Sequence, residues 1–397
     1  MAHPDIAEVG EKIERSWSAR DYDASAFPAI CADVLTVAGL HRTLAPKAIL
    51  DWALQGDLPR QADPEAAFGQ PPITLFRARR FYIDALFWVD GTTSVHDHGF
   101  SGAFQVLSGS SIETTFAFDE TRDVDGQLRF GALRVLGTQL LQQGDVQPIA
   151  AGPTFIHSLF HLPRPAVSLV ARTFSDVNPG VQLSYLPPGI AHNSFHADQT
   201  LDRLLQIVEL LRSTDDPTFE TRTGDLIASS DLHTAFSIVK ACEKTSDRSR
   251  LARLIGRVRD PEARPLLAAW AASAERIRFL QTRRALVHDP DLRFMLAVLL
   301  NAHRRQDALS LVSAYATTLP ASRQIAAWLA KLATVTARLQ LASGPWEPNL
   351  LGLPSFTARR EEALAAALGD QQTSSMAEEA DFLGQLRSLP HLQPLFR

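Results

Sequence analysis

The sequence predicts an α+β protein in which a β-barrel lies between a helical N-terminal flank and an all-α C-terminal region. The composition of the 397 residues, 45% hydrophobic and 21% charged, is typical of a globular chain. Short apolar runs rich in Phe, Val and Thr occupy the middle of the chain, whereas helical periodicity dominates on both sides. The length exceeds that of one common domain, so more than one compact unit is expected.

The first segment, residues 1–69, is predicted to be a helical flank. Apolar residues recur at helical spacing over 29–37 and again over 48–54. A stretch rich in Pro, Gly and Asp, from Gly56 to Pro72, then ends the helical pattern. We therefore place the end of the flank near residue 69.

The second segment, residues 70–187, is predicted to be a β-sandwich or barrel. Gly, Asp and Asn separate its short apolar runs, which is typical of such folds. Asp123-Val-Asp-Gly126 suits a hairpin turn between two strands. The expected strands cover residues 74–79, 81–89, 103–107, 112–118, 132–140, 155–157, 166–173 and 182–186.

The third segment, residues 198–397, is predicted to be all-α, because Ala, Leu, Arg and Glu recur with a helical period. Asp260-Pro261, Asp289-Pro290 and Pro320 mark three helix starts, since an Asp cap followed by Pro satisfies free amides and presets φ. Their nearly regular spacing would suit stacked helical hairpins. The alternative is that Pro is simply common where helices begin.

Charge and composition exclude several classes of protein. Residues 1–200 carry 14 basic against 22 acidic residues and residues 201–397 carry 25 against 22, so neither half suits a nucleic-acid footprint. No apolar run reaches the roughly 18 residues of a membrane helix, and the start lacks the pattern of a secretory signal. Cys31 and Cys242 are too few for a disulfide framework or a thiolate zinc site. We therefore expect a cytoplasmic protein with neither a membrane nor a nucleic-acid partner.

Two separated histidine motifs predict a metal site. In His96-Asp-His98 the two imidazoles are two residues apart, so on an extended chain both project from the same face. Downstream, Gly144-Asp-Val-Gln-Pro148 and a further Gly precede His157 on another expected strand. If both segments line the inside of one barrel, three imidazoles occupy one face of an ion and leave its other positions open.

These motifs resemble those of the cupin superfamily, whose first motif is a Gly, then His-x-His and a later Gly. The second cupin motif is Gly-Asp-x-x-x-Pro, a Gly and then His-x-x-x-Asn. The resemblance implies a cupin β-barrel, or jelly roll, with His96, His98 and His157 as metal ligands. His161 stands where the second motif usually has Asn.

Within that superfamily the sequence resembles the cysteine-dioxygenase-like thiol dioxygenases, which use three histidines on ferrous iron. The Glu that serves as fourth ligand in other cupins is missing, because Gly102 and Ala103 stand at its position. The shared residues are Trp88 before the first motif and Pro165-Ala-Val-Ser-Leu169 after the third histidine. The resemblance covers roughly residues 70–186 and implies an all-histidine Fe(II) site.

The sequence departs from the animal cysteine dioxygenase around the metal. The His and Tyr that follow Ala-Val-Ser-Leu in that enzyme become Val170 and Arg172 here, and its crosslinked Cys becomes Ala103. Arg172 shares a strand face with Ser168, the face that looks into the barrel in the relatives, so it is a candidate to hold a substrate anion. A salt bridge on the barrel rim is the alternative. The region in which the relatives carry their substrate-binding Arg here contains Arg77, Arg79 and Arg80.

Further polar residues are candidates beside the metal. Tyr82 alternates onto an inward face and could offer a hydroxyl to a substrate, with ordinary aromatic packing as the alternative. His161 competes with His157 for the metal or lies beside it. Gln105 is expected to face into the barrel. Two more histidines are expected in a solvated connector: His192 and His196.

A three-histidine site leaves a divalent ion its full charge, so an anionic group binds well and a coordinated thiol would be deprotonated. Nitrogen ligands with open positions suit Fe(II), Ni(II), Zn(II) or Cu(II), and the resemblance favours Fe(II). The first hypothesis is an iron-dependent oxygenase that acts with O₂ on a small anionic substrate, of which a thiol is one candidate. The alternatives are a redox-neutral lyase or isomerase, and a non-catalytic cupin that binds a metal or ligand and contacts a protein partner through its helices.

The C-terminal helices are expected to dock on the barrel and cap its mouth. Amphipathic helices must bury their apolar faces, and the connector Tyr185-Leu-Pro-Pro-Gly189 is short and stiff. A self-contained helical bundle is the alternative.

Overall fold

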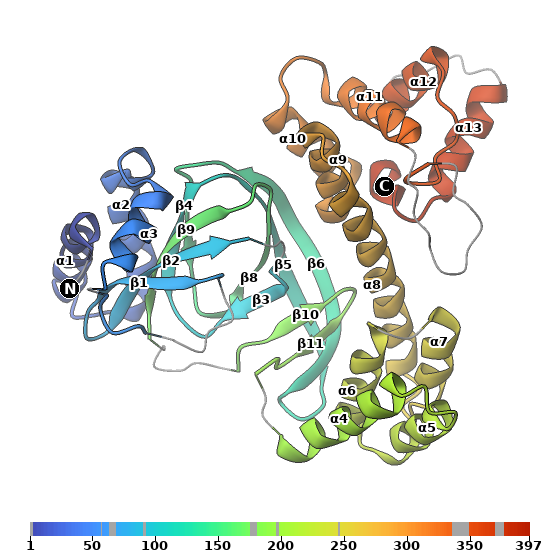
Figure 1. The fold of residues 1–397 in the computed structure, drawn as a ribbon, viewed down its shortest axis with the longest axis horizontal. Coiled ribbons are helices and arrows are strands. Elements are labelled where there is room, and N and C mark those ends of the chain that lie inside the picture. Colours follow the sequence, from blue (N-terminus) through green and yellow to red (C-terminus); the bar gives the residue numbers. More distant parts are fainter. Residues whose placement is uncertain are drawn as a thin grey trace.

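The computed structural model describes residues 3–56, 58–62, 69–89, 93–174, 181–195, 198–244, 247–335, 349–369 and 377–397. Two β-sheets form a barrel at the centre of the molecule, and helices flank it on two sides (Figure 1). This arrangement confirms the predicted α+β class, with helices before and after a β-barrel.

In the described part of the chain, three α-helices precede the barrel: α1 (Pro4–Ser18), α2 (Phe27–Ala38) and α3 (Pro46–Leu54). Each has Pro in its first turn, where the missing N–H leaves no intrahelical bond unmade. Gly39 ends α2 with a φ of 56°, the left-handed conformation that favours glycine at a helix end. The helical flank is thus confirmed, with α1 added to the two stretches whose periodicity indicated helices.

The first sheet contains five strands in the order β1 (Pro72–Arg77), β2 (Phe81–Trp88), β9 (Ala166–Thr173), β4 (Gly102–Ser108) and β7 (Val146–Ile149). The second contains, in order, β10 (Ser184–Leu186), β11 (Ile190–His192), β6 (Leu128–Leu141), β5 (Ser111–Asp123), β8 (Gly152–His161) and β3 (Val95–His98). Pairing of β3 with β10 closes the second sheet on itself. All strand pairs are antiparallel.

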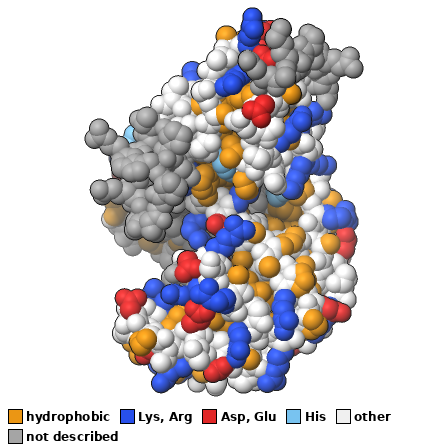
Figure 2. All heavy atoms as spheres, turned by 90° about the vertical axis from the view of Figure 1, so that its right-hand side faces the viewer, with side chains coloured by type: hydrophobic (Ala, Val, Ile, Leu, Met, Phe, Trp, Pro, Cys, Tyr) orange, Lys and Arg blue, Asp and Glu red, His pale blue; other side chains and the backbone are white. Residues whose placement is uncertain are grey.

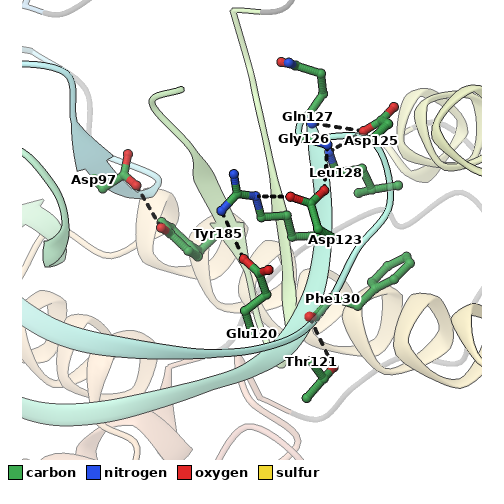
Figure 3. Close-up of polar contacts among 11 residues, drawn as sticks. Asp97, Glu120, Thr121, Asp123, Asp125, Gly126, Gln127, Leu128, Phe130 and Tyr185 are labelled. Atoms are coloured by element: carbon green, nitrogen blue, oxygen red, sulfur yellow. Dashed lines mark hydrogen bonds and ion pairs between the residues drawn. The ribbon is translucent and has the colours of Figure 1, made fainter. Parts of the chain in front are cut away.

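The eight expected strands correspond to β1, β2, β4, β5, β6, β8, β9 and β10. Asp123-Val-Asp-Gly126 forms the predicted turn between β5 and β6, in which Gly126 N donates to Asp123 Oδ1 at 2.6 Å (Figure 3). Strands β3, β7 and β11, each of three or four residues, were not among the expected strands.

The N-terminal helices cover the outer face of the first sheet (Figure 1). Ile83 and Phe87 of β2 share one buried cluster with Phe27 and Leu35 of α2. Residues 24–42, which include α2, are apolar and long enough to cross a membrane by length and composition alone, so the expectation that no such run exists was too strict. In this structure the apolar side of α2 packs against the barrel.

The helical region after the barrel consists of α4 (Gln199–Ser213), α5 (Phe219–Ser229), α6 (Leu232–Glu243), α7 (Arg248–Gly256), α8 (Ala263–Leu286), α9 (Pro290–Asn301), α10 (Arg305–Tyr315), α11 (Ala321–Thr334), α12 (Ala358–Leu368) and α13 (Ala377–Ser388). Helix α8 joins a group formed by α4–α7 to one formed by α9–α13 (Figure 1).

The helix starts predicted at Asp289-Pro290 and Pro320 are confirmed, whereas α8 begins at Ala263, two residues after Pro261. The Asp260 carboxylate accepts from the Ala263 amide at 3.0 Å, Asp289 accepts from Leu292 N, and α11 follows Pro320 directly. The helices that begin at these sites have 24, 12 and 14 residues, so they are not copies of one length.

The helical region docks on the outer face of the second sheet. Ile112 of β5 and Phe160 of β8 belong to the buried cluster that contains the cores of α9 and α11. At the β5–β6 turn, Arg122 forms an ion pair with Asp260 at 2.6 Å. Docking on the barrel is therefore confirmed, but the helices cover a side wall instead of the mouth. On the face that the helical region turns away from the barrel, basic, acidic and hydrophobic side chains are intermingled (Figure 2).

Candidate metal centre

Three histidines from two strands of the second sheet converge at the inner face of the barrel. His96 and His98 lie on β3, and His157 lies on β8 in register with His96. The ring centroids are 4.7 Å apart for His96 and His98, 5.0 Å for His96 and His157, and 4.9 Å for His98 and His157. The potential ligand atoms of this three-histidine group all lie within 4.8 Å of one another. The structure thus brings together the three residues that the two motifs predicted.

Two of these rings are held by hydrogen bonds on their Nδ1 side. Nδ1 of His96 lies 2.7 Å from the carbonyl oxygen of Ser94. Nδ1 of His157 lies 2.9 Å from Oε1 of Glu113, a buried carboxylate on β5, whose Oε2 accepts from Gln139 Nε2 at 2.8 Å. With the Nδ1 proton engaged, Nε2 of each ring is left as the metal-binding nitrogen.

Burial favours the neutral form of His96 and His98. It lowers the pKa of His96 to about 3, with the nearby His157 adding to the effect. It also lowers the pKa of His98 well below its ordinary value. A neutral imidazole has a free lone pair, so these two rings can bind a cation at neutral pH.

The strand that carries two of the ligands is anchored by the residue between them. Asp97 points to the opposite face of β3, where its Oδ2 accepts from the Tyr185 hydroxyl at 2.8 Å (Figure 3). Its Oδ1 accepts from Leu183 N at 2.7 Å. These bonds attach β3 to the β10 segment and limit how far His96 and His98 can move.

The donor set fits a divalent transition metal. It consists of buried imidazole nitrogen atoms, and one of the three rings has a carboxylate partner of the kind that orients metal-bound histidines. Among the described residues, no other cluster of three or more His, Cys, Asp and Glu brings its ligand atoms this close. Gly102 and Ala103 supply no carboxylate, so three protein ligands leave positions for other molecules.

A cavity of about 630 Å³ opens onto the three-histidine group. Strands β2, β4 and β9 of the first sheet form one wall, while β3 and β8 carry the histidines on the other. None of the described residues of α4–α13 lines this cavity, so the expectation that these helices complete the substrate pocket is wrong. The helices instead pack behind the β5–β6–β8 side, where apolar outward residues are available.

Arg172 lies in the cavity wall and has an acidic partner. Its Nη2 donates to Asp84 Oδ2 at 2.9 Å, and both side chains are buried. Its guanidinium also lies 4.9 Å from the ring centroid of Tyr82, which lines the same cavity. The inward placement expected for Arg172 and Tyr82 thus holds, and the Arg172 salt bridge belongs to the cavity wall.

His161 lies farther along β8 and is separate from the three-histidine group. Its ring stacks on Trp88 with centroids 4.5 Å apart, and its Nδ1 lies 2.8 Å from Ser111 Oγ. Burial, with a smaller contribution from the neighbouring His157, lowers the pKa of His161 to about 4. His161 does not line the cavity, and its contacts are with Trp88 and Ser111 inside the barrel.

Other candidate residues lie away from the cavity. Gln105 points outward, where its Nε2 donates to Leu35 O of α2 at 3.3 Å, so its expected inward orientation is wrong. His192 belongs to β11 and is buried, with its Nε2 3.1 Å from Lys240 Nζ, so it is not part of a solvated connector. His196 lies outside the described residues. The arginines before the first motif, none of which lines the cavity, are Arg77, Arg79 and Arg80.

Two acidic residues of this site were missed by the sequence analysis: Glu113 and Asp84. Both interrupt otherwise apolar or hydroxylic strand sequences, Ile112-Glu-Thr-Thr and Tyr82-Ile-Asp-Ala-Leu. A lone carboxylate in a strand expected to be buried indicates a specific partner, because an unpaired buried charge is costly. That signal was available in the sequence.

Comparisons with known proteins give structural but not sequence relatives. No family model matches the chain, and no match was found among curated proteins. One similar solved structure is a hydroquinone 1,2-dioxygenase from Sphingomonas sp. TTNP3 with 4-hydroxybenzoate bound, at 16% identity over 30% of this chain and 72% of that one, with a TM-score of 0.22.

Two others are described as cupins. A cupin superfamily protein from Desulfitobacterium hafniense DCB-2 is 17% identical over 30% of this chain and 95% of its own, with a TM-score of 0.19. A sugar phosphate isomerase from a cupin superfamily of Silicibacter pomeroyi DSS-3 is 16% identical over 33% of this chain and 80% of its own, with a TM-score of 0.22. At these values none of them assigns a reaction to this chain.

Proposed function

We propose that this protein is a non-haem Fe(II)-dependent oxygenase of the three-histidine, cysteine-dioxygenase-like kind. The observation that carries the proposal is the buried group of His96, His98 and His157, which has no carboxylate ligand and faces a cavity. Imidazole ligands with open positions suit Fe(II), and the sequence resemblance to thiol dioxygenases favours that ion over Ni(II), Zn(II) or Cu(II). The substrate is a small molecule that binds the ion through an anionic donor atom.

The residues of the chain have separable roles in this proposal. An iron ion held by the three imidazoles would supply adjacent binding positions for O₂ and for the donor atom of the substrate. Glu113 fixes the ring orientation of His157 and makes its Nε2 a stronger donor. Asp97 holds the strand that carries the other two ligands. The cavity walls exclude water from the rest of the substrate and orient it.

The proposal is tested by metal analysis joined to oxygen uptake. Protein purified without oxygen should contain iron or take up one Fe(II) per chain, and a panel of thiols, phenols and other metal-binding compounds should include one that drives O₂ consumption. His157→Ala should abolish that consumption. Turnover of a substrate without O₂ uptake would overturn the proposal and favour the redox-neutral lyase or isomerase.

A further inference from the structure

We propose that the cavity selects a substrate with one metal-binding head group and a bulky apolar body of aromatic size, and that it discriminates against a small thiol carrying a carboxylate. The inference rests on the proposed function for the role of the metal and names the substrate class of the same site. Three observations carry it: the size of the cavity, the chemistry of its walls and the pairing of its one charged residue.

The cavity is larger than a small amino-acid substrate needs. Its volume of about 630 Å³ lies within the roughly 300–1,000 Å³ of sites that enclose drug-sized ligands. An apolar cavity of about 150 Å³ is already enough to hold benzene. A ligand of a few heavy atoms would therefore leave most of this cavity to water.

The walls opposite the histidines are mostly aromatic and aliphatic. Leu86 and Trp88 of β2, Phe104 of β4 and Val170 of β9 are all buried and face the cavity. They form one hydrophobic cluster across three strands of the first sheet. A ligand body that covers this wall removes apolar surface from water, which favours binding in proportion to the area covered.

The apolar lining continues to the cavity edge. Phe174 and Phe195 line the cavity although 37% and 64% of their surfaces are exposed to solvent. Exposed aromatic side chains beside an apolar cavity gain contact area when a ligand body fills it. The apolar wall and these two rings thus provide one surface for a single occupant.

The charge in the cavity is already balanced. Arg172 is the one charged side chain among the described residues that line it, and it forms a buried ion pair with Asp84 at 2.9 Å. A substrate carboxylate would have to compete with Asp84, and separating a buried pair leaves a charge without compensation. The wall therefore offers no free positive charge, and the ion at the histidines remains the place for an anionic group.

The test is a titration of the full chain, loaded with Co(II) under argon, with three thiols that differ only in the group X of X–CH₂–CH₂–SH. Thiolate binding is followed by the ligand-to-metal charge-transfer absorption. With X as phenyl, binding should be about 10- to 100-fold tighter than with X as hydrogen, the gain for burying a Phe-sized group. With X as carboxylate, binding should be weaker than with X as phenyl, even though the carboxylate can occupy a second open position on the ion. The inference would be overturned if the carboxylate ligand bound more tightly than the phenyl ligand. It would also be overturned if all three thiols bound with equal affinity, or if no thiol bound.

Two variants sharpen the test. Asp84→Asn removes the charge that balances Arg172, so the carboxylate ligand should gain at least tenfold relative to the phenyl ligand, and an unchanged ratio would contradict the assigned pairing. Phe195→Ala should weaken the phenyl ligand several-fold. Leu136→Ala, at a residue that is 57% exposed on β6 and outside the cavity, is the matched control and should change nothing. If Asp84→Asn fails to fold, the order of affinities in the wild-type protein still decides.

The two proposals fail in different ways. An absence of O₂ consumption by the Fe(II)-loaded protein, with the predicted order of thiol affinities intact, would reject the oxygenase and leave the substrate class standing. A reversed order of affinities would reject the substrate class whatever the oxygen measurement gives.

Discussion

Glu113→Gln tests whether the carboxylate behind His157 tunes the metal site. Glu113 and His157 are buried at 1% and 2% exposure, with 2.9 Å between Oε1 and Nδ1. The substitution keeps the shape of the side chain but replaces a carboxylate acceptor with a neutral amide. A charge-assisted bond in a buried site is worth about 1.5–3 kcal/mol, roughly twice a neutral one. Loss of such a partner weakens metal binding about 10- to 100-fold.

We therefore expect the dissociation constant for Zn(II) or Co(II) to rise about 10- to 100-fold in Glu113→Gln, measured by competition with a chromophoric chelator at neutral pH. Glu120→Gln is the matched control, because Glu120 lies on the same strand but pairs with Arg129 at 3.0 Å near the surface. Circular dichroism and the unfolding midpoint would establish that both variants keep the fold. An affinity in Glu113→Gln within threefold of wild type, or an equal loss in Glu120→Gln, would refute the reasoning.

Three further predictions concern the ligand histidines, two buried histidines outside the metal centre, and the contact between the barrel and the helical region. Replacing any one of the three ligand histidines with Ala should remove most of the metal, as measured by elemental analysis, whereas His161→Ala should retain it; full occupancy in His157→Ala would contradict the assignment. Burial lowers the pKa of His192 to about 3 and of His303 to about 4, below the ordinary value of 6.5, so the unfolded chain binds more protons as pH falls below 6.5. Each of these two residues should therefore lower the free energy of unfolding of the metal-free protein by at most about 1.4 kcal/mol per pH unit as the pH falls from 6.5 to 4. Urea unfolding should show that His192→Gln loses less stability over this pH range than the wild-type protein. An equal loss of stability in the two proteins would contradict this prediction. Ile112→Ala should cost about 2–5 kcal/mol of unfolding free energy because Ile112 packs against the helical region, while exposed Leu136→Ala should cost under about 0.5 kcal/mol; equal costs would show that the docking contact is not stabilising.

The features of the site that could be predicted from sequence are those that local geometry determines. His96 and His98 share a face because side chains alternate along a strand, and β8 brings His157 into register with His96. The turn at Asp123–Gly126 and the helix starts after Asp260 and Asp289 likewise depend on residues within a few positions of one another.

What could not be predicted depends on contacts between distant segments. Glu113 is 44 residues from His157, and Asp84 is 88 residues from Arg172, so only the strand order brings these pairs together. Gln105 was placed on the wrong face because a shift of one residue reverses every side chain of a strand. In the structure Phe104 faces the cavity and Gln105 faces α2.

The surface of the barrel on which the helical region docks could also not be predicted from the sequence. Its amphipathic helices and the short connector predicted docking on the barrel, but several barrel surfaces could have received them. The choice is made by outward apolar residues of the second sheet, such as Ile112, Phe160 and Phe130, which become visible only when strand faces are known. Because of those residues the helices pack on the side wall of the barrel, and none of their described residues lines the cavity.

The central claim is that the three-histidine group holds Fe(II) with a position open to O₂. Nitric oxide is a stable substitute for O₂, so the most direct measurement is the electron paramagnetic resonance spectrum of Fe(II)-loaded protein exposed to nitric oxide without oxygen. We predict the half-integer-spin signal of an iron–nitrosyl complex in the wild-type protein and in His161→Ala, and its absence in His157→Ala. A wild-type protein that binds Fe(II) but gives no nitrosyl signal, or a full signal in His157→Ala, would contradict the account.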